Sequence, residues 1–153
     1  MRRDSRLSAT LHALLHLAEH KEPMTSEALA ACMRTNSVVV RRTMAALRKA
    51  GLVRSEKGHG GGWTLTCDLR SVSLRDVYVA LGEPLLFALG NRTENPDCLV
   101  EQAVNRALNR AFLEAEDLLS DRLSTVSLAE LAADFHRLFV RHNRNQKKVA
   151  HGL

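Results

Sequence analysis

The chain of 153 residues lacks any long apolar segment. A membrane-spanning helix needs about 18 consecutive apolar residues, and no run in this sequence approaches that length. The opening residues, MRRDSRLSAT, also lack the apolar segment of a signal peptide. We therefore expect a cytoplasmic protein that does not contact a membrane.

Cysteine is scarce, and the three cysteines (Cys32, Cys67 and Cys98) form no C-x-x-C pair. This spacing excludes a disulfide framework and a zinc ribbon. Motifs of catalysis are missing as well. The sequence has no nucleophile elbow, no H-E-x-x-H, and no Gly-rich phosphate loop that follows a strand and opens a helix. We expect that the protein is not an enzyme.

Charge is divided unevenly along the chain, although the formal net charge is only +5. Residues 1–70 carry 12 Lys and Arg against 6 Asp and Glu, whereas residues 71–140 carry 6 against 11. A basic half followed by an acidic half is typical of a DNA-contacting module joined to an assembly module. An uneven distribution of solvated charges is the alternative that charge alone leaves open.

Three helices are predicted in the first third of the chain. Leucines of residues 5–20 fall on one stripe at helical spacing (Leu7, Leu11, Leu14 and Leu15, with Ala18). Thr25 or Ser26 can cap a short helix, Glu27–Met33. A third helix runs from the N-cap Asn36 to about residue 50. A short helix, a turn and a longer helix form the helix-turn-helix pattern.

A β-hairpin is predicted directly after these helices. Two short apolar runs, LVRS and WTLT, are separated by a turn with glycines at positions 58, 60, 61 and 62. Lys57 and His59 stand in that turn. A tip made mostly of glycine has little side-chain bulk and can lie close to another surface. The hairpin and the basic helix before it together predict a winged helix-turn-helix that binds nucleic acid.

The third helix should present two faces. Val40, Met44 and Leu47 fall together and are expected in the core. Basic and small side chains lie opposite, which suits the major groove, where arginine bonds guanine O6 and N7. The first residues of such a helix contact bases, while later basic residues position the protein on phosphates. A solvated basic helix is the alternative. The candidate DNA-binding residues are Thr25, Ser26, Asn36, Ser37, Val38, Arg41, Arg42, Arg48, Lys49, Lys57, His59 and Gly60.

A further short helix closes the first domain. Ser73 and Asp76 approximate a capping box for a helix that ends at Gly82. The winged helix-turn-helix domain therefore covers residues 1–82. Residues 83–97 contain two prolines and one glycine and are interpreted as a connector.

The second half is predicted to mediate dimerisation. A helix of roughly 22 residues, from 98 to about 119 or 123, is long for a small domain, and such helices often pack against a partner subunit. Ser127 with Glu130 caps a last helix, so residues 98–140 form the dimerisation part. The tail 141–153 is basic, lacks apolar periodicity and is expected to be disordered. The long helix carries a stripe of Val100, Val104, Ala107, Leu108, Ala111, Ala115, Leu118 and Leu119.

Residues 5–140 resemble the IscR/NsrR/CymR family of bacterial winged-helix regulators. The resemblance is carried by LRKAGLVRSEKGHGGGWTL, HALLHLAEH, TSEALA and SLRDVYVALGEP. It implies a mainly α fold with a small β-hairpin, and a homodimer that binds partly palindromic double-stranded DNA operators through crossing long helices. It also implies that residues Asn36–Arg41 read the major groove and that Lys57–Gly60 enters the minor groove.

The chain departs from the family pattern at several positions. Lys57 stands where the family usually has arginine, and a point charge replaces a planar fork there. Val39 and Arg41 stand where many relatives carry Tyr or Glu, so operator sequences cannot be transferred. Relatives that hold an iron–sulfur cluster use three clustered cysteines, of which only Cys98 has a counterpart here. We therefore expect no cluster and no other cofactor.

Cys98 is a candidate sensor of oxidants or electrophiles. With Asp97 as N-cap, Cys98 would lie in the first turn of the long helix, where the helix dipole favours the thiolate. An ordinary small residue at the dimer seam is the alternative. Cys32 is interpreted as a core residue. His12, His16 and His20 repeat at a spacing that can hold a metal, but a polar helix face is the more common meaning, and we predict no metal site.

The favoured function is that of a homodimeric, sequence-specific transcriptional regulator, and more specifically a repressor. A winged-helix module that binds proteins instead of operators is one alternative, and an iron–sulfur-sensing regulator is another. Steeply salt-dependent binding to duplex DNA would separate the favoured function from a protein-binding module.

Overall fold

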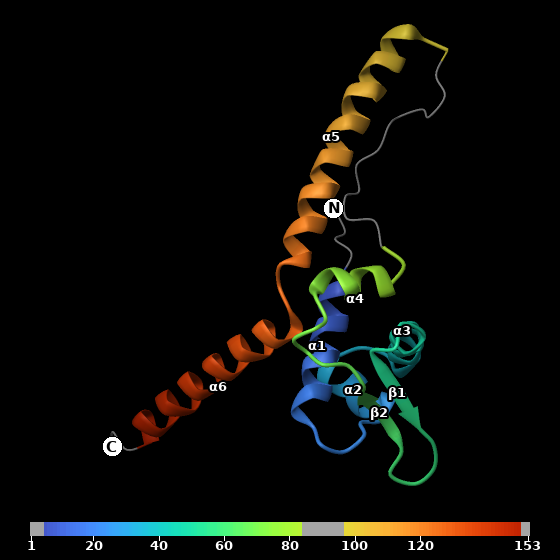
Figure 1. Ribbon diagram of the computed structural model, residues 1–153. Coiled ribbons are helices and arrows are strands. Elements are labelled where there is room, and N and C mark those ends of the chain that lie inside the picture. Colours follow the sequence, from blue (N-terminus) through green and yellow to red (C-terminus); the bar gives the residue numbers. More distant parts are fainter. Residues whose placement is uncertain (1–4, 84–96, 151–153) are drawn as a thin grey trace.

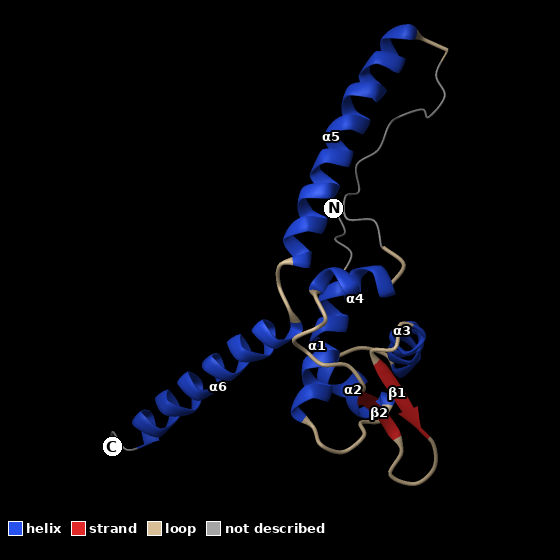
Figure 2. Cartoon of the chain, in the orientation of Figure 1, coloured by secondary structure: helices blue, strands red, loops and turns tan. Residues whose placement is uncertain are grey.

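A computed structural model describes residues 5–83 and 97–150 of the chain and shows a compact head from which two helical arms extend (Figure 1). Within these residues the structure is mainly helical with one two-stranded antiparallel sheet, which confirms the predicted fold class (Figure 2). The elements are α1 (Arg6–Glu19), α2 (Ser26–Met33), α3 (Ser37–Lys49), β1 (Val53–Glu56), β2 (Gly62–Leu65), α4 (Leu74–Ala80), α5 (Leu99–Ser124) and α6 (Leu128–Ala150).

One hydrophobic core holds the head together. Leucines and methionines from the first three helices fill it, and Leu128, the first residue of α6, is fully buried in the same cluster. The stripe predicted for α1 is only partly correct, because Ala13 and Leu17 are buried whereas Leu15 and Ala18 are half-exposed. Because α1 packs against α2, α4 and β2, its buried face is rotated about the helix axis relative to the predicted leucine stripe. The largest fully buried side chains are Leu14, Leu29, Met44, Leu47, Leu128, Val40, Val77 and Thr10.

Polar caps fix where the helices begin. Thr25, and not Ser26, caps α2: its hydroxyl oxygen accepts from the backbone N–H of Ala28 at 3.1 Å. Capping satisfies N–H groups that have no partner inside the helix. At α4, Ser73 and Asp76 form the complete capping box that the sequence predicts.

The hairpin is fastened to the loop ahead of α2. Met24 and Trp63 exchange two backbone hydrogen bonds, of 3.0 and 2.8 Å. A β-carbon at Gly62 would lie 2.6 Å from the Met24 carbonyl oxygen, so only glycine permits this approach. The position of the wing relative to the helices is thus set by backbone contact.

The arms begin and end differently from the prediction. Cys98, and not Asp97, is the N-cap of α5. The expected disorder of the tail is wrong for residues 141–150, which continue α6 as a helix. Arginine, glutamine and lysine are good helix formers, and no glycine or proline interrupts them before Gly152. Most of the predicted connector, residues 84–96, lies outside the described residues.

Both arms carry apolar side chains in solvent. Leu128 anchors the start of α6 in the head, and Arg75 of α4 donates from Nε to Ser120 Oγ of α5 at 2.6 Å. Beyond these anchors the arms leave the head in different directions (Figure 1). Among the described helices, none is both long and apolar enough to cross a membrane. The exposed apolar residues of the arms are Leu99, Val100, Val104, Leu108, Leu113, Leu118, Phe135, Leu138, Phe139 and Val140.

Candidate nucleic-acid interface

Helix α3 has the two faces that its sequence predicts. Val40, Met44 and Leu47 are buried on its inner face. On the outer face, Val38 is 56% exposed, and Arg42 is exposed beside it. Apolar and basic side chains that are both in solvent can contact the edges of bases and the thymine methyl group. The outer face of α3 is therefore the centre of the candidate interface.

Part of the hydrogen-bonding capacity at the start of α3 is used to cap the helix. Asn36 Oδ1 accepts from the backbone N–H of Val38 at 2.7 Å, as expected for an N-cap. Asn36 is exposed and Ser37 is half-buried. The amide nitrogen of Asn36 remains available as a donor to a base or a phosphate, whereas its oxygen is committed to the helix.

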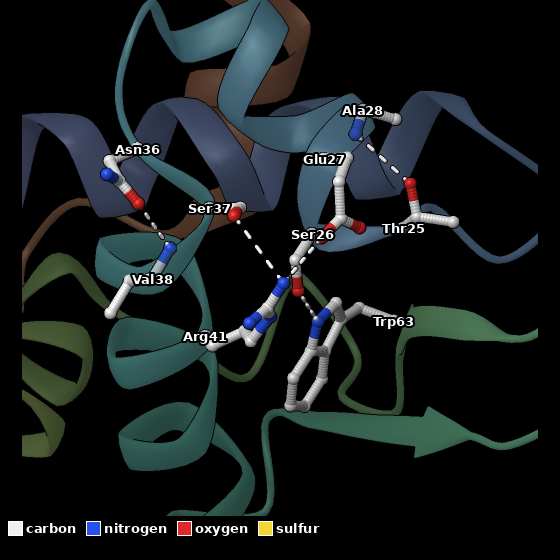
Figure 3. Close-up of polar contacts among 9 residues, drawn as sticks. All are labelled: Thr25, Ser26, Glu27, Ala28, Asn36, Ser37, Val38, Arg41 and Trp63. Carbon is white, nitrogen blue, oxygen red and sulfur yellow. Dashed lines mark hydrogen bonds and ion pairs between the residues drawn. The ribbon is translucent and has the colours of Figure 1, made fainter.

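Arg41 points toward α2 and binds an acidic residue there (Figure 3). Its Nη2 donates to Glu27 Oε1 at 2.6 Å and lies 3.5 Å from Ser37 Oγ. The hydrogen bond from Arg41 holds the pKa of the Glu27 carboxyl below its usual value. Glu27 is not among the predicted site residues, because no local pattern relates it to a residue on another helix.

Arg48 connects α3 to the wing. Its Nη1 donates to Ser55 Oγ of β1 at 3.3 Å, and its guanidinium carbon lies 6.0 Å from the centre of the Trp63 ring. The second distance is at the limit of a cation–π contact. Arg48 and its neighbour Lys49 are both exposed, so they can also reach a phosphate.

The side chain of Ser26, one of the predicted DNA-binding residues, is turned into the core. Ser26 is buried, and its hydroxyl oxygen accepts from Trp63 Nε1 at 2.9 Å (Figure 3). A buried indole N–H needs a partner, and Ser26 supplies it from the first turn of α2. Thr25 lies next to it at the surface, although its hydroxyl is used to cap α2.

The wing tip is open to solvent. Lys57, His59 and Gly60 are all exposed in the loop between β1 and β2. Gly58 has φ +90° and Gly60 has φ +75°, backbone conformations that glycine adopts without steric cost. The narrow tip with a cation at its base has the shape that the minor groove admits.

The three cysteines lie in different segments of the chain. Cys32 is exposed on α2, which contradicts its interpretation as a core residue. Cys67 is half-buried after β2, and burial raises the pKa of its thiol. Cys98 is exposed at the N-cap of α5. Within residues 5–83 and 97–150, no group of three or more His, Cys, Asp or Glu side chains could hold a metal ion.

The histidines of α1 form a ladder on its surface. The Nε2 atoms of His12 and His16 lie 2.9 Å apart, and His20 Nδ1 lies 2.8 Å from the carbonyl oxygen of His16. Partial burial lowers the pKa of His16, and repulsion from His12 and His20 lowers it further. The ladder is a polar surface of α1, with His12 and His20 exposed and His16 half-buried.

Related proteins are known over most of the chain. YwnA of Bacillus subtilis, named as an HTH-type transcriptional regulator, is 33% identical over 129 residues, which cover 84% of this chain and 95% of YwnA. The solved structure of IscR from T. potens has a TM-score of 0.65 at 20% identity and covers 88% of each chain. CymR of B. subtilis, described as the global cysteine regulator, has a TM-score of 0.62 at 21% identity over 87% of this chain and 97% of its own.

A family model provides the assignment. Residues 3–134 match the Rrf2 family, described as iron-dependent transcriptional regulators. Cys32, Cys67 and Cys98 lie in separate segments, and no group of three possible metal ligands occurs in the described part of the chain. The matched residues nevertheless include the helix-turn-helix, the wing and the long arm. The chain belongs to the Rrf2 family of transcriptional regulators, which are DNA-binding proteins and not enzymes.

Proposed function

We propose that this regulator acts in the cytoplasm as a homodimeric repressor that binds a specific operator. The observation that carries this proposal is the outer face of α3, whose basic and apolar side chains are in solvent next to an exposed wing. A basic helix and a narrow wing joined side by side can enter adjacent grooves of one duplex.

Each part of the head has its own task in this proposal. Arg41 and Arg42 contact base edges in the major groove, together with Asn36 and Val38 at the start of α3. Phosphates on either side are bound by basic side chains that position the head without reading sequence. The phosphate-binding residues are Arg48 and Lys49, while Lys57, His59 and Gly60 enter the minor groove.

Dimerisation is supported by the apolar side chains of the arms. Leu113 and Leu118 of α5 are each 61% exposed in the single chain, and α6 exposes Phe139 as well. Large contiguous apolar surfaces in soluble proteins usually mark an interaction site. Pairing of α5 and α6 with a second copy would cover them and place two copies of α3 about one DNA turn apart.

The proposed signal acts on Cys98. Its thiol is exposed at the N-terminus of α5, where modification would alter the start of the arm. A shift of α5 would change the spacing of the two heads and weaken operator binding. Cys98→Ser is expected to bind DNA as before and to lose its response to an oxidant or a quinone. A variant that still responds fully would rule out this sensor.

In vitro selection from a random duplex library tests DNA binding. We expect one partly palindromic sequence to be enriched, with affinity that falls on the order of 100-fold or more between 50 and 200 mM salt. Weak binding without salt dependence would favour a protein-interaction module. Transcription in vitro from a promoter that carries the selected sequence then tests repression, and an increase in transcript would contradict a repressor role.

A further inference from the structure

The ion pair between Arg41 and Glu27 bridges the two helices of the helix-turn-helix motif (Figure 3). Glu27 lies in the first turn of α2, and Arg41 lies in the second turn of α3. The contact therefore brings an acidic side chain of α2 onto the surface that the proposed function places against DNA.

This ion pair has little to do with folding. The two side chains are 57% and 64% exposed, and ion pairs in solvent contribute little to the free energy of unfolding. The core of the head is built from other residues, and the buried polar contact between α2 and the wing is made by Ser26 and Trp63. The position of this ion pair is therefore not explained by its contribution to the free energy of unfolding.

The geometry leaves the arginine able to bind a base. Both contacts that the described residues make with the guanidinium of Arg41 use Nη2. Each two-donor edge of a guanidinium includes Nη2, paired either with Nη1 or with Nε. Nη2 carries two N–H groups, and its contact with Ser37 at 3.5 Å is long and weak. One Nη2 N–H, together with Nη1 or Nε, can therefore bond guanine O6 and N7 in one plane. An arginine held at one end also loses less rotational freedom when it binds.

The charge of Glu27 acts against incorrect sequences. The hydrogen bond from Arg41 lowers the pKa of Glu27, so its carboxylate stays ionised at neutral pH. A carboxylate at the edge of a groove repels phosphates and acceptor atoms of bases. In a duplex with a guanine opposite Arg41, the hydrogen bonds to that guanine offset this repulsion. A duplex without the guanine gains no such bonds and binds more weakly.

We propose that Glu27 is a specificity-determining residue, which orients Arg41 toward a guanine and disfavours duplexes without that guanine. This inference rests on the proposed function, because it requires α3 to lie in the major groove.

Two dissociation constants test the proposal in the full chain. One is measured on the duplex that wild-type protein selects from a random library, and the other on a scrambled duplex of equal length and composition. Glu27→Gln keeps the volume of the side chain and removes its charge. We expect the scrambled duplex to bind about 3- to 10-fold more tightly, and the ratio of the two constants to fall roughly 10-fold.

A matched control separates this effect from net charge. Arg110 and Glu114 form an exposed ion pair on α5, with Nε and Oε1 at 3.1 Å. Glu114→Gln changes the net charge by the same amount, so both dissociation constants should shift alike and leave their ratio unchanged. An equal loss of discrimination in Glu114→Gln would overturn the role of Glu27.

A double variant tests whether Glu27 acts through Arg41. In an Arg41→Ala background, Glu27→Gln should no longer change the ratio, because no guanidinium remains to be oriented. If the ratio still falls, the positioning role is wrong. If wild-type protein selects no sequence, the proposed function itself fails. If it selects one and Glu27→Gln keeps the ratio within about 3-fold, only this inference is overturned.

Discussion

At the scale of single residues, the hydrogen bond between Ser26 and Trp63 holds α2 to the wing inside the core. Ser26→Ala would leave the buried indole N–H without an acceptor, and we expect a loss of about 1–3 kcal/mol in the free energy of unfolding. Urea denaturation measures this loss. Ser55→Ala removes an exposed serine hydroxyl on the same hairpin and should change stability by less than about 0.5 kcal/mol. Equal effects of the two variants would show that burial of the bond does not matter.

Two basic residues of α3 should respond differently to removal. Arg41→Ala is expected to lose roughly 1–3 kcal/mol on the selected duplex and to relax the preference at one base pair. Lys49→Ala should weaken binding to all duplexes similarly and reduce the salt slope by about one, because phosphates carry no sequence. Binding titrations on selected and scrambled duplexes measure both effects. A strongly sequence-selective effect of Lys49→Ala would contradict its assignment to a phosphate.

At the scale of secondary-structure elements, much of the fold is predictable from local signals. The capping residues Asn36 and Ser73 fix helix starts because their side chains bond backbone groups two or three residues away. The contact of Arg41 with Glu27 spans 14 residues, and that of Trp63 with Ser26 spans 37. No periodicity encodes such pairs, so the sequence predicts neither the acidic partner of Arg41 nor the buried contact of Ser26. The helical tail is missed because a helix without an apolar stripe resembles a coil in sequence.

The histidine ladder of α1 predicts a pH dependence of stability. The pKa of His16 is lowered in the folded chain by burial and by repulsion from its neighbours on the ladder. The unfolded chain therefore binds this proton more readily, and acidification favours unfolding. This destabilisation of the folded chain is absent above the usual histidine pKa and grows as the pH falls below that value. It is complete once the pH lies below the lowered pKa of His16. The melting temperature should drop less between about pH 7.5 and about pH 5.5 in His16→Gln than in wild type. His59→Gln, at the exposed wing tip, should drop as wild type does.

At the scale of the whole molecule, the proposed operator binding requires the arms as well as the head. A single copy of α3 meets only a few base pairs, whereas two heads at a fixed spacing read a longer site. In the proposed dimer, the stripe of α5 would supply the surface for pairing, since Val104 is 50% and Leu108 is 39% exposed in one chain. Operator binding and dimerisation are therefore expected to weaken together when this stripe is damaged.

Leu108→Glu tests that link directly. A carboxylate placed in an apolar interface must be buried without a partner, which costs several kcal/mol and should raise the dimer dissociation constant on the order of 100-fold. Sedimentation should give about twice the chain mass of 17.0 kDa for wild type and the chain mass for the variant. Asn109→Glu adds the same charge at an exposed position of α5 that has no stripe residue three or four positions away, and this variant should remain dimeric. Because each head keeps its own contacts, the monomeric variant should retain weak salt-dependent binding but lose the preference for two half-sites. If Leu108→Glu stays dimeric at the same concentration, the two chains do not pair through the apolar stripe of α5.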